Sequence, residues 1–175
     1  MKQIHILFVL SLFLFTACGG STESTSKEES QEKVLLAPEV EEEERPIDIP
    51  ESVEIVIEGN DQMRYNLTTI EVYEGQTVKL TLKHTGEMPK ETMGHNWTLL
   101  SSGVELEEFA IAAITAVDND YIPADRMSDI IANTTLIGGG EETSIEFTAP
   151  AKGNYKFLCT FPGHFGMMNG DFIVK

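Results

Sequence analysis

The chain is poor in cysteine, histidine and basic residues. It has two cysteines and four histidines in 175 residues, and 12 Lys and Arg stand against 29 Asp and Glu. Two cysteines cannot build a disulfide framework, and four histidines are too few for an enzyme with several histidine-bound metal sites. The net charge of −17 excludes a nucleic-acid partner, because phosphate would be repelled.

Long apolar runs are missing except at the start, where residues 4–15 are almost all apolar and 16–18 read Thr-Ala-Cys. This run is too short for a spanning helix, so it predicts a secretory signal peptide over residues 1–17. A cysteine directly after the cleavage point is typical of a bacterial lipoprotein. We therefore expect lipid on Cys18 and attachment of the mature chain to a membrane of the bacterial cell envelope. An ordinary signal peptide with an incidental cysteine is the alternative.

Residues 18–50 have no periodic apolar face. They hold ten acidic and three basic residues, many Ser and Thr, and prolines at 38, 46 and 50. Such a segment cannot bury enough apolar surface to fold, so we expect a disordered acidic tether. The run Glu41–Glu44 could suggest a metal site, but a solvated, self-repelling spacer is the better interpretation.

Residues 51–175 have the length and pattern of one all-β domain. Short alternating apolar runs predict strands at 53–57, 70–73, 78–82, 97–100, 144–147, 155–159 and 171–174. Such strands, separated by Gly, Pro or Asn, predict a Greek-key β-sandwich or barrel. One segment differs, since apolar residues at 106, 109, 110, 113, 114 and 117 follow helical spacing. We expect an amphipathic helix over about 105–118, packed on the sheets.

The segment from Cys159 to Met168, CTFPGHFGMM, concentrates possible metal ligands. It holds a thiol, an imidazole at His164, and thioethers at Met167 and Met168. Its proline and two glycines rule out a regular helix, so these side chains should converge from a tight loop. Thiolate, imidazole and thioether suit an ion that cycles between Cu(I) and Cu(II), as in blue-copper centres with two histidines, one cysteine and a weak axial ligand.

The second histidine must come from elsewhere, and His84 and His95 are the candidates. His95 follows Gly94 and precedes a strand-like run, whereas His84 ends the alternating run at 77–83. A glycine lets the backbone approach closely, so the Gly94 carbonyl could face the metal opposite the methionine. We therefore favour His95, with His84 as the less favoured alternative.

These motifs resemble those of azurins, the bacterial blue-copper electron carriers of the cupredoxin family. The resemblance rests on MGHNW at 93–97 and CTFPGH at 159–164, and extends to GNDQM at 59–63 and TLIG at 135–138. It implies one copper ion with His95, Cys159 and His164 as equatorial ligands. It also implies Met168 as the axial ligand, with the Gly94 carbonyl as a weak further contact.

Residues beside the ligands are expected to shape the site. Asn96 and Thr160 directly follow ligands and are candidates for hydrogen bonds around the cysteine sulfur. The resemblance implies that Asn96 ties the ligand segments together and that His84 lies beside the copper without binding it. It also implies that a disulfide typical of azurins is absent here, because Val53 and Gln76 occupy the matching positions.

The expected function is single-electron transfer in the periplasm, between partners such as c-type cytochromes or copper reductases. Four protein ligands around one ion leave no clear position for substrate, so we do not expect an enzyme. The resemblance and the apolar character of the residues predict a docking surface around His164, formed by Met63, Met88, Met93, Phe161, Pro162 and Met167.

Three other functions compete with electron transfer. A cysteine hydrolase could pair Cys159 with His164, but the further ligand-type residues argue against it. A multicopper enzyme would need a second copper site, which the remaining histidines cannot build. A copper chaperone or copper store is the strongest alternative, since soft ligands on a tethered domain could also hand over metal.

Overall fold

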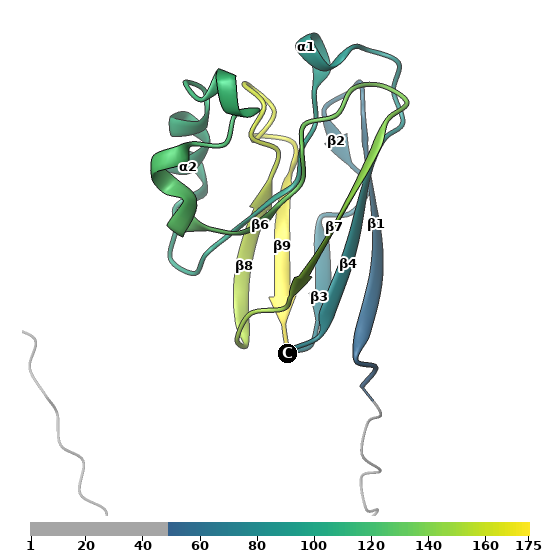
Figure 1. The fold of residues 1–175 in the computed structure, drawn as a ribbon, viewed down its shortest axis with the longest axis vertical. Helices are drawn as coiled ribbons and strands as arrows, with labels where there is room; N and C mark the ends of the chain where they lie inside the picture. The colour runs from purple at the N-terminus through teal and green to yellow at the C-terminus, as the bar shows by residue number, and fades with distance from the viewer. Residues whose placement is uncertain (1–48) are drawn as a thin grey trace, which may run out of the picture. The chain divides into compact units, whose positions relative to one another are not determined.

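Two mixed β-sheets face each other in the computed structural model, which describes residues 49–175 (Figure 1). The predicted signal peptide, Cys18 and nearly all of the predicted tether lie outside the described residues. The strands are β1 (Ser52–Asn60), β2 (Arg64–Tyr65), β3 (Thr69–Val72), β4 (Thr77–His84), β5 (Thr98–Leu100), β6 (Ile130–Asn133), β7 (Glu142–Thr148), β8 (Gly153–Leu158) and β9 (Asn169–Val174). The helical elements are α1 (Lys90–Met93), α2 (Leu106–Ala113) and the 3-10 turns η1 (Val117–Asn119) and η2 (Ala124–Asp129).

The topology confirms the predicted all-β sandwich. One sheet has the strand order β2-β1-β4-β7, and the other has the order β3-β9-β8-β5-β6. β1 pairs with β4 and β3 with β9 in parallel, while the remaining pairs are antiparallel. Within the described residues no strand pairing joins the two sheets, so the architecture is a sandwich rather than a closed barrel.

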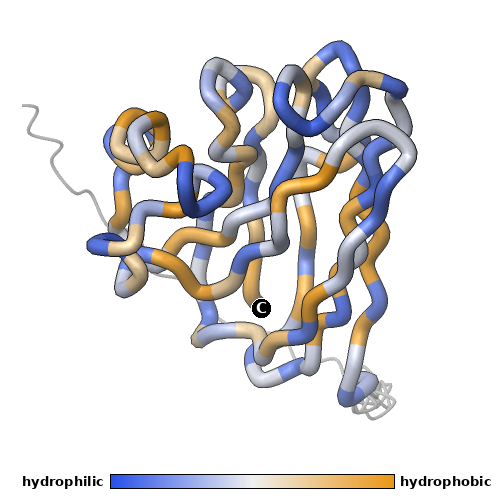
Figure 2. The backbone as a smooth tube through the Cα atoms, turned by 45° about the horizontal axis from the view of Figure 1, so that its top comes forward, coloured by the Kyte–Doolittle hydropathy of each residue, from blue (hydrophilic) through white to orange (hydrophobic). Residues whose placement is uncertain are grey.

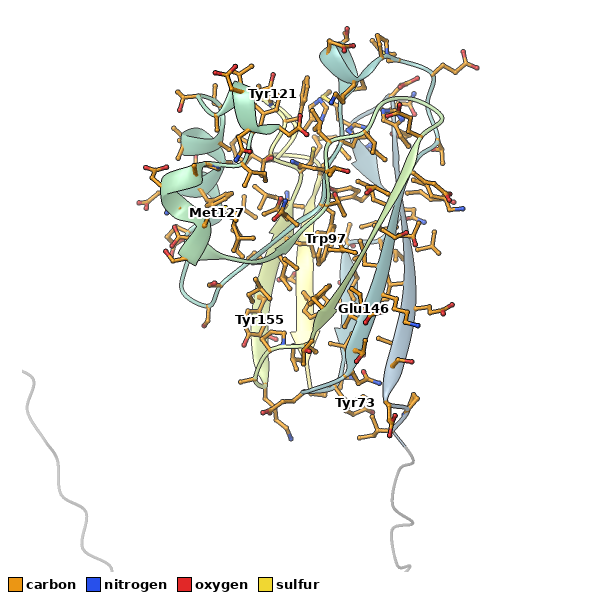
Figure 3. All side chains as sticks on the ribbon, in the orientation of Figure 1. Tyr73, Trp97, Tyr121, Met127, Glu146 and Tyr155 are labelled. Carbon is orange, nitrogen blue, oxygen red and sulfur yellow. The ribbon has the colours of Figure 1, made fainter. Side chains whose placement is uncertain are left out.

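The core between the sheets follows from strand alternation. Along β4, Val78, Leu80 and Leu82 are buried while the intervening residues are more exposed, and Figure 2 shows hydrophobic and hydrophilic stretches alternating along the strands. Trp97 is fully buried, with its ring centroid 5.6 Å from that of Phe157 (Figure 3). The two sheets therefore hold the ligand-bearing loops on a packed aromatic core.

The helical segment is shorter than predicted. α2 ends at Ala113, and its inner face buries Phe109, Ala110 and Ala113 as the spacing suggested. The predicted face was wrong beyond that point, because Ile114 and Val117 are 44% and 60% exposed. The chain leaves the α-helical path after Ala113, so helical spacing no longer turns later residues toward the sheet.

Gln76 and Val53, where the resemblance implied a missing disulfide, take part in hydrogen bonding and strand pairing. Gln76 is buried, its side-chain carbonyl accepts a hydrogen bond from the Tyr73 amide, and its Nε2 donates to the Pro50 carbonyl at 2.8 Å. Val53 pairs with Val78 across β1 and β4. Hydrogen bonds of the buried Gln76 side chain therefore hold the start of the domain, at Pro50, in place of a covalent crosslink.

Candidate metal centre

Three buried side chains from separate segments converge at one end of the sandwich. One ligand atom each from His95, Cys159 and His164 lies within 4.8 Å of the others. The Cys159 sulfur is 3.7 Å from His164 Nδ1, and the His95 and His164 ring centroids are 5.1 Å apart. His95 enters just before β5, Cys159 follows β8, and His164 lies in the β8–β9 loop. The described residues contain no other such cluster of His, Cys, Asp and Glu.

The β8–β9 loop is closed by its own backbone. Gly163 has a φ of 85°, a left-handed conformation that favours glycine, and the following amide of His164 donates to the Phe161 carbonyl. The amide of Cys159 then donates to the carbonyl of Met168 at 2.9 Å. This bond brings the two ends of the loop together. Met168 is fully buried, whereas its neighbour Met167 is 45% exposed.

The Gly94 carbonyl faces the cluster. Its oxygen lies 3.0 Å from His95 Nδ1 and 3.9 Å from the Cys159 sulfur. The glycine was expected to allow close approach of the backbone to the metal, but the structure gives another reason for it. A Cβ at Gly94 would lie 2.5 Å from the Lys90 carbonyl oxygen and 3.0 Å from Leu136, so α1 leaves no room for a side chain.

Gly59 is a site residue that sequence reasoning missed. A Cβ at this position would lie 2.6 Å from His95 Cδ2 and 3.2 Å from Met168 Cε. Strand β1 therefore packs directly against both the His95 imidazole and the Met168 thioether. The signal available in the sequence was the GNDQM motif at 59–63, which pointed to the family but not to this contact.

Asn96 and Thr160 join the two ligand segments. Asn96 Nδ2 donates to Thr160 Oγ1 at 2.7 Å, and the Thr160 amide donates to Asn96 Oδ1 at 2.9 Å. The two bonds also fix the orientation of the Asn96 amide, because a backbone N–H must face its oxygen. The segments that carry His95 and Cys159 are thus held in register by one buried pair.

His84 lies beside the cluster with both ring nitrogens already engaged. Its Nδ1 accepts a hydrogen bond from the Gly86 amide at 3.1 Å, so its Nε2 carries the proton and donates to the Met93 carbonyl at 2.8 Å. The ring stacks on His95 with centroids 4.2 Å apart. His84 therefore supports the His95 ring and offers no free nitrogen to a metal.

The surroundings of His95 fit a bound cation. Burial lowers the pKa of His95, so its ring is neutral and has a single N–H. Both of its nitrogens nevertheless lie 3.0 Å from a carbonyl oxygen, Nε2 from Asn60 and Nδ1 from Gly94. One nitrogen lone pair must then face an oxygen lone pair inside a buried site. A metal ion bound by that nitrogen would remove this repulsion.

Residues 51–175 match the family model of the copper-binding proteins of the plastocyanin/azurin family. The chain belongs to this family. It is 42% identical to outer membrane protein H.8 of Neisseria gonorrhoeae over 118 residues, which cover 65% of this chain and 63% of that protein. It is 39% identical to azurin of Pseudomonas aeruginosa over 124 residues, or 68% and 82% of the two chains. The chain thus spans somewhat less than two thirds of the length of the H.8 proteins.

Solved structures agree with this assignment. Auracyanin A, a blue copper protein of Chloroflexus aurantiacus, matches with a TM-score of 0.65 and 35% identity, covering 71% of this chain and 99% of that one. An azurin from Methylomonas sp. strain J matches with a TM-score of 0.62 and 34% identity, covering 70% and 97%. The cupredoxin fold and one copper ion as cofactor follow for this family member.

The donor set fits copper chemically. A thiol and two imidazoles combine a soft ligand for Cu(I) with ligands that suit both oxidation states. Burial raises the pKa of Cys159 to about 11, while the amides of Asn96 and Phe161 direct hydrogen bonds to its sulfur and lower it. Burial also lowers the pKa of His164 to about 4, which keeps this imidazole neutral and available as a ligand.

Apolar side chains surround the ligand loop. The Phe161 ring lies 4.6 Å from the His164 ring and 5.1 Å from that of Tyr121, which belongs to the turns after α2. Met167 is exposed, Phe161 is buried, and the other predicted docking residues are half-buried, namely Met63, Met88, Met93 and Pro162. His164 itself is only 2% exposed, and Phe161 is the apolar side chain that packs on its ring.

Proposed function

We propose that this chain is an electron carrier that passes single electrons through one copper ion. The observation that carries the proposal is the convergence of His95, Cys159 and His164, all buried, on a rigid β-framework. Copper supplies the one-electron chemistry when bound. The protein keeps water out of the site and holds the three ligands in nearly one arrangement for both oxidation states, which keeps the reorganisation small.

Two further ligands complete the proposed centre. Met168 would offer its thioether as a weak further ligand, because its side chain is buried and its Cε lies against Gly59, next to the His95 ring. The Gly94 carbonyl, whose oxygen lies 3.9 Å from the Cys159 sulfur, would offer a weak further contact. Asn96, Thr160 and His84 hold these ligands in place through the hydrogen bonds and ring stacking described above.

An enzymatic role has no support at this site. A hollow of about 400 Å³ near the end of α2 is lined by residues such as Ala112, Asn119 and Asp125, none of which is a proposed ligand. A hydrolase would need an exposed, oriented nucleophile, whereas Cys159 is fully buried and its thiol pKa is raised by that burial. We therefore propose outer-sphere electron transfer without a bound substrate.

Electron transfer and copper delivery make opposite demands on copper exchange. The full chain, loaded with copper, should exchange electrons rapidly between its oxidised and reduced forms while releasing copper slowly to a Cu(I) chelator. Buried ligands held by β8, β9 and β5 favour this result, because release requires the loop to open. Line broadening in NMR spectra of mixed-valence samples measures the exchange. Fast copper release together with slow electron exchange would identify a copper chaperone or copper store instead.

We propose that partners dock on the apolar surface formed by Met63, Met88, Met93, Phe161, Pro162 and Met167. Support comes from the Phe161 ring, which packs on His164, and from the exposed side chain of Met167 on the same loop. Residues 51–175 carry nineteen acidic and eight basic residues, a net charge of −11. An apolar surface on an acidic body suits a partner with a basic rim, such as a c-type cytochrome or a copper reductase.

Met167→Gln should slow electron transfer to a basic c-type cytochrome by about 5–10-fold, since an exposed apolar contact is worth ~1 kcal/mol. Stopped-flow kinetics of the copper-loaded full chain measure the rate. Met127→Gln is the matched control, because Met127 is 51% exposed but lies in η2 beside α2 (Figure 3). Equal rates for the two variants would argue against docking at the ligand loop.

The protein acts at the bacterial cell envelope in this proposal. Support comes from the signal-like residues 1–17 and from the similarity to a protein described as an outer membrane protein. The lipid on Cys18 would hold the copper domain in the periplasm, on an acidic tether formed by residues 18–50. Within residues 49–175 no helix has the length and apolar character to cross a bilayer.

A further inference from the structure

A tyrosine hydroxyl lies buried beside the cysteine ligand. Tyr65, in the short strand β2, is 7% exposed and donates a hydrogen bond from its hydroxyl to the Asn96 carbonyl. The same hydroxyl lies within hydrogen-bonding reach of the Cys159 sulfur. The sequence gives no sign of this contact, because no ligand lies near Tyr65 along the chain.

The hydroxyl completes the hydrogen bonding of Asn96. The backbone N–H of Asn96 is directed at the Cys159 sulfur, and the Asn96 side chain is hydrogen-bonded to Thr160. The carbonyl is the remaining polar group, and Tyr65 satisfies it.

We propose that Tyr65 is a positioning residue that raises the reduction potential of the copper centre. Its hydroxyl holds the Asn96 carbonyl, so that the backbone N–H of Asn96 keeps its direction toward the Cys159 sulfur. Donors near a thiolate stabilise the reduced, more electron-rich centre more than the oxidised one. This role rests on the proposed electron-transfer function.

Core packing alone would be the simpler role of Tyr65. Its ring lies 5.9 Å from that of Phe157, at an interplanar angle of 55°. Phenylalanine would keep this contact and remove only the hydroxyl. If Tyr65 only packs in the core, Tyr65→Phe should lower the stability of the protein somewhat and leave the reduction potential of the copper centre unchanged. The reduction potential therefore separates the two roles.

The test compares Tyr65→Phe with Tyr155→Phe in the copper-loaded full chain. Tyr155 is a matched control, because it is also buried and donates from its hydroxyl to a backbone carbonyl, that of Ala151 at 2.7 Å. It lies in β8 toward the end away from the ligand loop (Figure 3). Spectroelectrochemical titration gives the potential, and thermal unfolding of the copper-free proteins shows that each variant folds.

We expect Tyr65→Phe to weaken the preference for Cu(I) over Cu(II) by about tenfold, which corresponds to a potential about 59 mV lower for one electron. The charge-transfer band should shift as well, while Tyr155→Phe leaves both unchanged. An unchanged potential in Tyr65→Phe, or an equal shift in both variants, would overturn the role of Tyr65. A wild-type protein without reversible copper reduction would instead overturn the proposed function.

Discussion

Cys159→Ser abolishes the intense blue absorption expected when Cu(II) is added to the full chain. The band requires charge transfer from a thiolate, and Cys159 is the one free cysteine among the described residues. A serine hydroxyl in the same buried position is a hard ligand that stays protonated, so it gives neither the electronic transition nor the affinity for Cu(I). Visible absorption during a copper titration measures the change.

The other cysteine supplies the control for this prediction. Cys18→Ser removes a thiol as well, but Cys18 lies outside residues 51–175, the region that matches the family. We expect this variant, loaded with copper in the same way, to keep the full band. A band that survived in Cys159→Ser would contradict the assigned cluster. A band lost in Cys18→Ser would show that Cys18, and not Cys159, is the thiolate that binds copper.

The ligand loop could be predicted because its chemistry is local. Cys159, His164 and Met168 lie within ten residues, and the Pro and Gly residues between them prevent a helix. The predicted strands also lie within the observed ones to within a residue or so, because alternating burial leaves a period of two in the sequence. In each case the pattern and its structural cause occupy the same short stretch.

The remaining features depend on contacts between distant segments. Tyr65 reaches Asn96, and 31 residues separate the two in the sequence. Ile114 and Val117 follow helical spacing, yet the chain turns after Ala113 and leaves them exposed. Asp120 and Tyr121 adopt positive φ values of 51° and 62° in that turn, although neither is the glycine that usually signals such a bend. Tertiary packing decided these positions, and a single sequence carries little trace of it.

Gly59 is the clearest case in which a distant contact controls the site. Its strand cannot move away from the ligands, because Gly59 pairs with Tyr65 in β2 on one side and with His84 in β4 on the other. Its carbonyl also accepts a hydrogen bond from the Thr85 amide at 2.8 Å. An added side chain must therefore displace the groups above it, the His95 ring and the Met168 methyl group.

Gly59→Ala should distort the copper centre without unfolding the domain. A Cβ only 2.6 Å from His95 Cδ2 forces the ring to shift, and overpacking of this kind costs about 1–3 kcal/mol. If this cost destabilises the copper-bound state, copper affinity falls by roughly 5–150-fold, since 1.4 kcal/mol is a factor of ten. Competition with a Cu(I) chelator measures the affinity, and electron paramagnetic resonance reports the changed geometry.

Two other glycines separate this effect from a general loss of stability. In Gly170→Ala the new Cβ would lie 2.4 Å from Phe157 Cζ and 2.4 Å from the Thr68 carbonyl oxygen, neither of which belongs to a proposed ligand. Gly166 lies in the ligand loop, but a Cβ there meets nothing within 4 Å. Gly170→Ala should lower the melting temperature and keep the copper spectrum, whereas Gly166→Ala should change neither. If Gly59→Ala and Gly170→Ala altered the spectrum alike, direct contact between β1 and the ligands would not be the cause.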